Sequence, residues 1–246
     1  MQEMKDSSSQ QGEILPSSNE KANKNFFRDF FGIIFDPKKA YDNIIKAKYW
    51  VVMLIVFLLV VGISEQFYHN VLINFQIKTA QEQTEKSGLS SDAMEQQIAF
   101  FNNSSLTRPI YFVTTIITQG IFLLIISLII FFICSVMVGG TAKFAGVWMI
   151  YLWTLVITIL DTIIKTPLMI IKNDMRAGLN LGLFFGPESK LGAAMSAVDI
   201  FTVWQFIVLG FGLAALYKFT VKRGMTISMV LWALYTIIFA IIGYVS

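Results

Sequence analysis

Charge, cysteine and histidine are scarce in this 246-residue chain, and each shortage excludes a class of protein. Only 14% of the residues are charged, whereas a soluble domain averages about 25%; this excludes an ordinary soluble enzyme and a disordered chain. One cysteine and one histidine exclude a disulfide framework and a metal centre built from these residues. A net charge of only +3 provides no dense basic face, so we expect no nucleic-acid partner.

Hydrophobic residues make up 55% of the chain and gather in five long runs bounded by charged residues. A helix rises about 1.5 Å per residue, so a hydrocarbon core of about 30 Å needs roughly 20 apolar residues. The runs lack the alternation of β-barrel strands, and in lipid only helices or closed barrels pair every backbone group. The sequence therefore predicts an all-α, polytopic membrane protein. Residues 26–246 form its membrane domain, a five-transmembrane-helix bundle with spans at about 49–66, 111–138, 145–164, 199–217 and 225–245.

The residues before the first span predict a polar tail and two amphipathic helices. Residues 1–25 are rich in Ser, Gln, Glu and Lys and are expected to be disordered. The following stretch, 25–35, has an apolar helical face suited to the membrane interface, with Arg28 and Asp29 on the opposite side. The apolar face consists of Phe26, Phe27, Phe30, Phe31 and Ile34. Asp36 and Pro37 then start a second helix as N-cap and first helical residue. These interfacial helices either moor the chain to lipid or dock a cytoplasmic partner.

The distribution of lysine and arginine predicts the orientation of the chain. With the N-terminus inside, the inner segments hold 12 Lys and Arg residues and the outer segments hold 7. Basic residues favour the cytoplasmic side. We therefore expect a cytoplasmic N-terminus and, after five spans, a C-terminus outside.

Three ionisable residues lie near the ends of predicted spans. Asp161 and Lys165 stand four residues apart, where they can pair on one helix face, and form either a helix-end pair or a functional intramembrane site. Asp199 opens the fourth span, either as an N-cap or as a buried partner for a cation or a neighbouring helix. His69 and Cys134 have no ligand neighbours in the sequence. We therefore predict no catalytic residues, no metal and no cofactor.

Glycine marks three further places in the sequence. Gly139 and Gly140 are expected to close a tight hairpin between the second and third spans. Gly210 and Ala214 form a small-xxx-small face, which lets a neighbouring helix approach closely. The loop 165–198 contains three glycines four residues apart, and it is either a re-entrant piece or an ordinary glycine-rich loop.

Three stretches of the chain resemble the Yip (Ypt-interacting protein) domain family of integral membrane proteins, and more closely its bacterial branch. They are FGIIFDPKKAYDNI at 31–44, VGGTAKF at 138–144 and VDIFTVWQFIVLGFGL at 198–213. The resemblance implies a structural signature, not an active site, at Asp36, Pro37, Gly139, Gly140, Asp199, Phe201, Trp204, Gly210 and Gly212. Eukaryotic relatives associate with small GTPases in vesicle traffic, a role that is not expected to transfer to a bacterial relative.

These observations together predict a non-enzymatic, multi-pass protein of the bacterial cytoplasmic membrane. We expect a membrane-embedded scaffold that binds a membrane-protein partner or a second copy of itself within the lipid bilayer. The alternative is a small transporter or ion channel that uses Asp161, Lys165 and Asp199. A lipid-handling protein would need a polar groove open to lipid, and the spans show no polar stripe that indicates one.

Overall fold

The computed structural model describes residues 18–46, 50–87, 91–186 and 189–245, which are mostly helical and contain no named strand. The five helices long and apolar enough to cross a membrane are α3 (Trp50–Ser87), α5 (Ser104–Phe132), α6 (Phe144–Lys172), α8 (Ile200–Tyr217) and α9 (Val221–Val245). The predicted all-α, five-helix membrane bundle is therefore confirmed.

Several of these helices are longer than the predicted spans. Helix α3 continues beyond residue 66, α5 begins before residue 111, and α6 continues beyond residue 164 through Pro167. The predicted bounds came from charged residues, which mark where a helix leaves lipid rather than where it ends. Beyond the hydrocarbon, a helix can continue in water with its backbone still paired.

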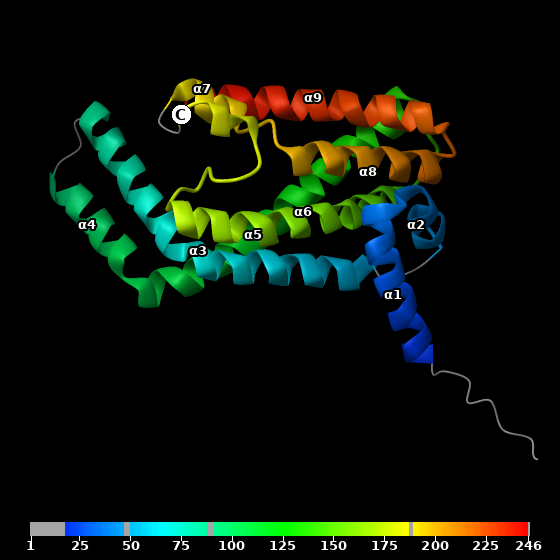
Figure 1. Ribbon diagram of the computed structural model, residues 1–246, viewed down its shortest axis with the longest axis horizontal. Coiled ribbons are helices and arrows are strands. Elements are labelled where there is room, and N and C mark those ends of the chain that lie inside the picture. Colours follow the sequence, from blue (N-terminus) through cyan, green and yellow to red (C-terminus); the bar gives the residue numbers. More distant parts are fainter. Residues whose placement is uncertain (1–17, 47–49, 88–90, 187–188, 246) are drawn as a thin grey trace, which may run out of the picture.

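The helices run between two ends of the bundle (Figure 1). We call the end that carries α1 (Ser18–Phe35) and α2 (Pro37–Ile44) the proximal end, and the opposite end, with α4 (Ser91–Asn102) and α7 (Lys190–Met195), the distal end. Helices α3 and α4 extend past the bundle distally, held by a small apolar cluster of Ile73, Ala80 and Phe101. The C-terminal end of α9 is also distal, as five crossings require.

Helix α6 is the centre of the bundle. In the most apolar part of each helix, 56% of the α6 residues are buried, compared with 17% in α5 and α9. Trp153, Ile150 and Leu152 of α6 are at most 1% exposed and lie in the main core together with Leu209 and Leu213 of α8. The outer helices present Ile and Leu side chains outward, as helices surrounded by lipid do.

Helix α1 begins at Ser18, inside the stretch that was expected to be a disordered tail. The expectation for residues 18–25 is therefore wrong, and residues 1–17 lie outside the described part of the chain. Once the apolar residues after Asn25 are anchored on the bundle, the helix can extend backwards by adding one backbone hydrogen bond per residue.

The structure buries Asp29, which was predicted on the polar face of α1, and leaves part of the predicted interfacial face exposed. Asp29 is 1% exposed and Ile33 is fully buried, whereas Phe27 and Phe31 are each 54% exposed. Asp29 can be buried because Arg28 donates two hydrogen bonds to its Oδ1, from Nε at 3.0 Å and Nη2 at 2.9 Å. Phe26 packs against Trp153 of α6 with ring centroids 5.5 Å apart. A second apolar stripe therefore remains on the outside of α1.

Helix α2 is fixed to the bundle by a tyrosine. Asp36 is its N-cap and accepts a hydrogen bond from the Lys39 backbone N–H, with Pro37 as the first helical residue. The fully buried Tyr41 donates a hydrogen bond to the Ile150 carbonyl oxygen at 3.0 Å, and burial raises the pKa of this phenol well above its usual value. A side chain at Gly212 would meet the Tyr41 ring at 2.9 Å. Glycine at 212 therefore lets α2 lie against the α8 backbone.

Helix α5 ends in a feature that the sequence did not predict. Its last turn widens into the π-helical segment η1 (Ile133–Met137). The chain then reverses at Gly139, whose φ of +75° favours glycine, and the Gly140 N–H donates to the Cys134 carbonyl oxygen at 2.9 Å. The two glycines thus make the turn that leads into α6.

Helices α8 and α9 approach each other closely along small residues. A side chain at Gly210 would meet Met225 of α9, and one at Gly224 would collide with the Gly210 carbonyl oxygen and the Ala214 Cβ. The predicted close approach on the Gly210–Ala214 face is therefore present, and α9 is the neighbour that makes it.

We predict that Gly224→Ala lowers the free energy of unfolding by about 1–3 kcal/mol, because the obstructing atom is rigid backbone. The matched control is Gly120→Ala on α5, where an added Cβ meets nothing within 4 Å. The control is expected to be neutral or stabilising by about 0.5–1 kcal/mol, because alanine is the better helix former. Denaturation of both variants in detergent measures the difference, and equal effects would contradict the close-packing interpretation.

Candidate functional site

The strongest cluster of ionisable groups lies between α6 and α8 in the distal half of the bundle. Lys165 Nζ is 2.8 Å from Asp161 Oδ2 and 3.1 Å from Asp199 Oδ2. Asp161 and Lys165 are one turn apart on α6, whereas Asp199 comes from the start of α8. Two residues that the sequence paired and a third that it treated separately thus form one cluster.

Asp199 has both of the roles considered for it. Its Oδ1 caps α8 by accepting from the backbone N–H groups of Phe201 at 2.8 Å and Thr202 at 3.2 Å, and its Oδ2 faces Lys165. Backbone hydrogen bonds hold it in place, because Leu181 donates to the Val198 carbonyl at 2.9 Å and Ile200 donates to the Leu179 carbonyl at 3.2 Å. The loop after α6 therefore helps to position a carboxylate against a lysine.

The cluster contains one more negative than positive charge. The side chains of Lys165, Asp161 and Asp199 are 25%, 16% and 4% exposed, so little water screens them. Asp161 Oδ1 is buried and has no hydrogen-bond partner among the described residues. Chemically, the arrangement can tie α6 to α8 and can take up a proton or a small cation on Asp161. The described residues contain no group of three His, Cys, Asp or Glu side chains suited to a metal ion.

Three hollows in the structure do not include this cluster. Two lie distally around the loop after α6 and share Lys172, Asp174 and Arg176. The third is an apolar groove of about 400 Å³ between α3 and α6, lined by residues such as Phe67 and Pro167. None of the three is lined by Asp161, Lys165 or Asp199. The loop itself contains the 3₁₀ turn η2 (Leu181–Phe184) and α7.

A second polar cluster, which was not predicted from the sequence, joins α3 to α5. His69 Nδ1 lies 2.9 Å from Glu65 Oε1, and His69 Nε2 lies 3.1 Å from Thr107 Oγ1. All three residues are at most 1% exposed. Glu65 Oε2 also accepts a hydrogen bond from Gln66 Nε2 at 2.6 Å. His69 is therefore a buried, partnered residue and not an isolated one.

The hydrogen bonds of Thr107 restrict the protonation of His69. The Thr107 hydroxyl donates to the Asn103 carbonyl oxygen at 3.1 Å, so its oxygen must accept from a proton on His69 Nε2. A further proton must then lie between His69 Nδ1 and Glu65, as an imidazolium–carboxylate pair or as a neutral imidazole with a carboxylic acid. In both forms the pair has no net charge, which is the condition that favours its burial.

A sequence signal for this cluster existed. Glu65 and His69 are four residues apart on one helix, the spacing at which side chains on a helix meet. In the sequence, Glu65 is also the charged residue at which the first apolar run ends. Thr107 carries no comparable signal, because its contact with His69 depends on how α5 packs on α3.

Comparison with known proteins supports the resemblance seen in the sequence. The family model of the Yip1 domain matches residues 31–242. The chain belongs to the Yip1 domain family. Neither the curated proteins nor the solved structures include a match to it.

The signature residues of this Yip1 domain are distributed over both ends of the bundle. Asp36, Pro37, Gly139, Gly140 and Gly212 lie in the proximal half, where they start α2, turn the chain or contact Tyr41. Asp199 and Phe201 lie at the distal start of α8, where the Phe201 and Trp204 rings stack with centroids 6.4 Å apart. Only Asp199 joins the ionisable cluster. The structure thus gives these residues packing and turn contacts rather than one shared site.

Proposed function

We propose that this Yip1 domain is a non-enzymatic, membrane-embedded scaffold that binds a membrane-protein partner or a second copy of itself. The multi-pass membrane domain provides the platform, and the helix pair α1–α2 provides the binding surface. The partner binds in the plane of the bilayer, and no nucleic acid takes part.

The observation that carries the proposal is the outer stripe of α1. Phe27, Phe31 and Phe35 follow each other at four-residue spacing and are 54%, 54% and 82% exposed. The opposite face of the same helix is fixed to the core through Phe26, Asp29 and Ile33. Three aromatic side chains on a rigid support suit a protein interface, because large aromatic residues dominate binding energy there.

Site-specific photocrosslinking in native membranes tests the proposal. A photoreactive residue at Phe31 is expected to give one discrete protein adduct, either a dimer of the chain or a complex with a single partner. The matched control position is Ile129 on α5, which is 45% exposed and faces outward from the bundle. Lipid adducts alone at both positions would show that α1 merely moors the chain and would contradict the proposal.

Transport is the second candidate function, and the cluster of Asp161, Lys165 and Asp199 is the observation that favours it. Ionisable groups inside a membrane often mark ion pathways. Purified protein in liposomes tests this candidate. A proton or Na⁺ flux that Asp161→Asn abolishes would support transport, whereas equal flux in the variant and the parent protein would count against it.

We also propose that the proximal end faces the cytoplasm of a bacterial cell and that the C-terminus lies outside. Lys38 and Lys39 belong to the proximal helix α2. Arg223 at the start of α9 donates to the Val138 carbonyl oxygen, in the turn before α6 that also contains Lys143. These basic residues agree with the preference of such residues for the cytoplasmic side. Reporter fusions at the two termini are expected to give opposite locations, and the same location for both would overturn this orientation.

A further inference from the structure

The two distal hollows share part of their lining and together form a basin in which basic side chains outnumber acidic ones among the described residues. We call them the distal basin; their volumes are about 330 and 630 Å³, and both are lined by Lys172, Asp174 and Arg176. Lys78 and Lys190 line the larger hollow together with Glu82. Four basic and two acidic residues therefore line the basin. Lysine and arginine are the side chains that recognise phosphate groups.

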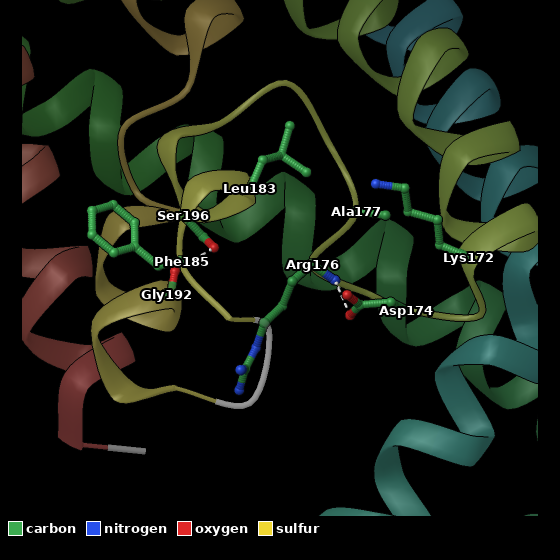
Figure 2. A pocket seen from close by; sticks show the side chains of 9 residues that line it. Lys172, Asp174, Arg176, Ala177, Leu183, Phe185, Gly192 and Ser196 are labelled. Carbon is green, nitrogen blue, oxygen red and sulfur yellow. Dashed lines mark hydrogen bonds between the residues drawn. The ribbon is translucent and has the colours of Figure 1, made fainter.

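One acidic residue, Asp174, lines both hollows and accepts a hydrogen bond from the backbone. Asp174 Oδ1 accepts a hydrogen bond from the Arg176 backbone N–H at 2.8 Å, which fixes the turn after α6. In Figure 2 a dashed line joins the Asp174 carboxylate to the Arg176 backbone, and the Arg176 side chain extends away from the Lys172 amine. The carboxylate thus shapes the loop that presents the two basic side chains.

Apolar residues on the same loop fit the acyl chains of a lipid. Leu183 and Phe185 line the smaller hollow together with Lys172 and Arg176 (Figure 2). Phe184, between them, is 82% exposed, and Ile171 at the end of α6 is 80% exposed. Such exposed apolar residues are stable at the boundary between headgroups and acyl chains. A ligand for this basin therefore carries a phosphate and an apolar part.

We propose that the distal basin binds the phosphodiester headgroup of an anionic glycerophospholipid, with Lys172 and Arg176 at the phosphate. The acyl chains run along Leu183, Phe184 and Phe185. Lysine and arginine side chains can hold the phosphodiester while the acyl chains stay in contact with the neighbouring apolar residues. The proposal is independent of the scaffold function, because the basin and the α1 stripe lie at opposite ends of the bundle.

Native mass spectrometry of the full chain in detergent, titrated with phosphatidylglycerol, tests the proposal. The double variant Lys172→Gln/Arg176→Gln is expected to weaken binding of the first lipid at least about tenfold, because each basic residue near a headgroup adds to the attraction. Lys38→Gln/Lys39→Gln removes the same charge at the proximal end and is expected to leave this binding unchanged. Equal weakening by both double variants would show general charge attraction and overturn the site.

A third variant tests the sign of the electrostatic effect. Asp174→Asn keeps an oxygen that can accept from the Arg176 N–H and removes one negative charge, so it is expected to tighten phosphatidylglycerol binding severalfold. This variant remains informative if the double variant does not fold. Unchanged or weaker binding in Asp174→Asn would contradict a phosphate at this place. Displacement of the lipid by millimolar inorganic phosphate would show a site for a free anion and overturn the lipid assignment.

Discussion

Replacement of Lys165 by methionine is expected to destabilise the protein by about 2–4 kcal/mol, because it leaves Asp161 and Asp199 buried without their shared cation. Loss of one partner from a buried ion pair typically costs 3–5 kcal/mol, and the 25% exposure of the Lys165 side chain reduces this value. The change corresponds to a fall of roughly 5–15 °C in the unfolding midpoint of a chain of this size. Thermal unfolding of the purified protein in detergent measures it.

Two further variants make this prediction specific. Lys222→Met makes the same substitution at an exposed position of α9 and is expected to change the midpoint little. The triple variant Lys165→Met/Asp161→Asn/Asp199→Asn removes all three charges, and asparagine at 199 can still cap α8. We expect it to be more stable than Lys165→Met alone. If Lys165→Met unfolded at the same temperature as Lys222→Met, the ion pairs would contribute no stability.

The number and the type of the membrane helices could be predicted from the sequence because lipid imposes a single rule. A run of roughly 20 apolar residues must form a helix there, whatever its neighbours are. Two local features could also be predicted from adjacent residues. They are the N-cap of α8 at Asp199 and the turn at Gly139–Gly140. Such features depend on a few consecutive residues, so no knowledge of packing was needed.

Contacts between helices could not be read from the sequence in the same way. Asp29 was predicted on the polar face of α1 because it is charged, whereas the structure buries it and leaves Phe27 and Phe31 of the predicted interfacial face exposed. That result depends on the Arg28–Asp29 hydrogen bonds and on the position of Trp153 of α6. Lys165 likewise meets Asp199 only because the loop after α6 brings the start of α8 to it. Neither contact has a signature in sequence spacing.

Replacement of Glu65 by leucine is expected to cost about 2–3 kcal/mol, because His69 Nδ1 is left buried without its hydrogen-bond partner. Glu65→Gln is the matched variant. A glutamine amide can donate to His69 Nδ1 while its oxygen still accepts from Gln66 Nε2, so we expect a cost within about 1 kcal/mol. Glu82→Leu, on an exposed part of the same helix, is the control and is expected to be nearly neutral.

The position of the shared proton can be measured directly because His69 is the one histidine of the chain. Nitrogen-15 labelling of histidine gives two ring signals, both assignable without further work. The Nε2 signal is expected to be that of a protonated nitrogen, because Thr107 Oγ1 has only acceptor capacity left for it. The Nδ1 signal then reports whether the proton lies on the ring or on Glu65. An unprotonated Nε2 would contradict the hydrogen-bond assignment, and equal stability of Glu65→Leu and the parent protein would show that the cluster does not hold α3 against α5.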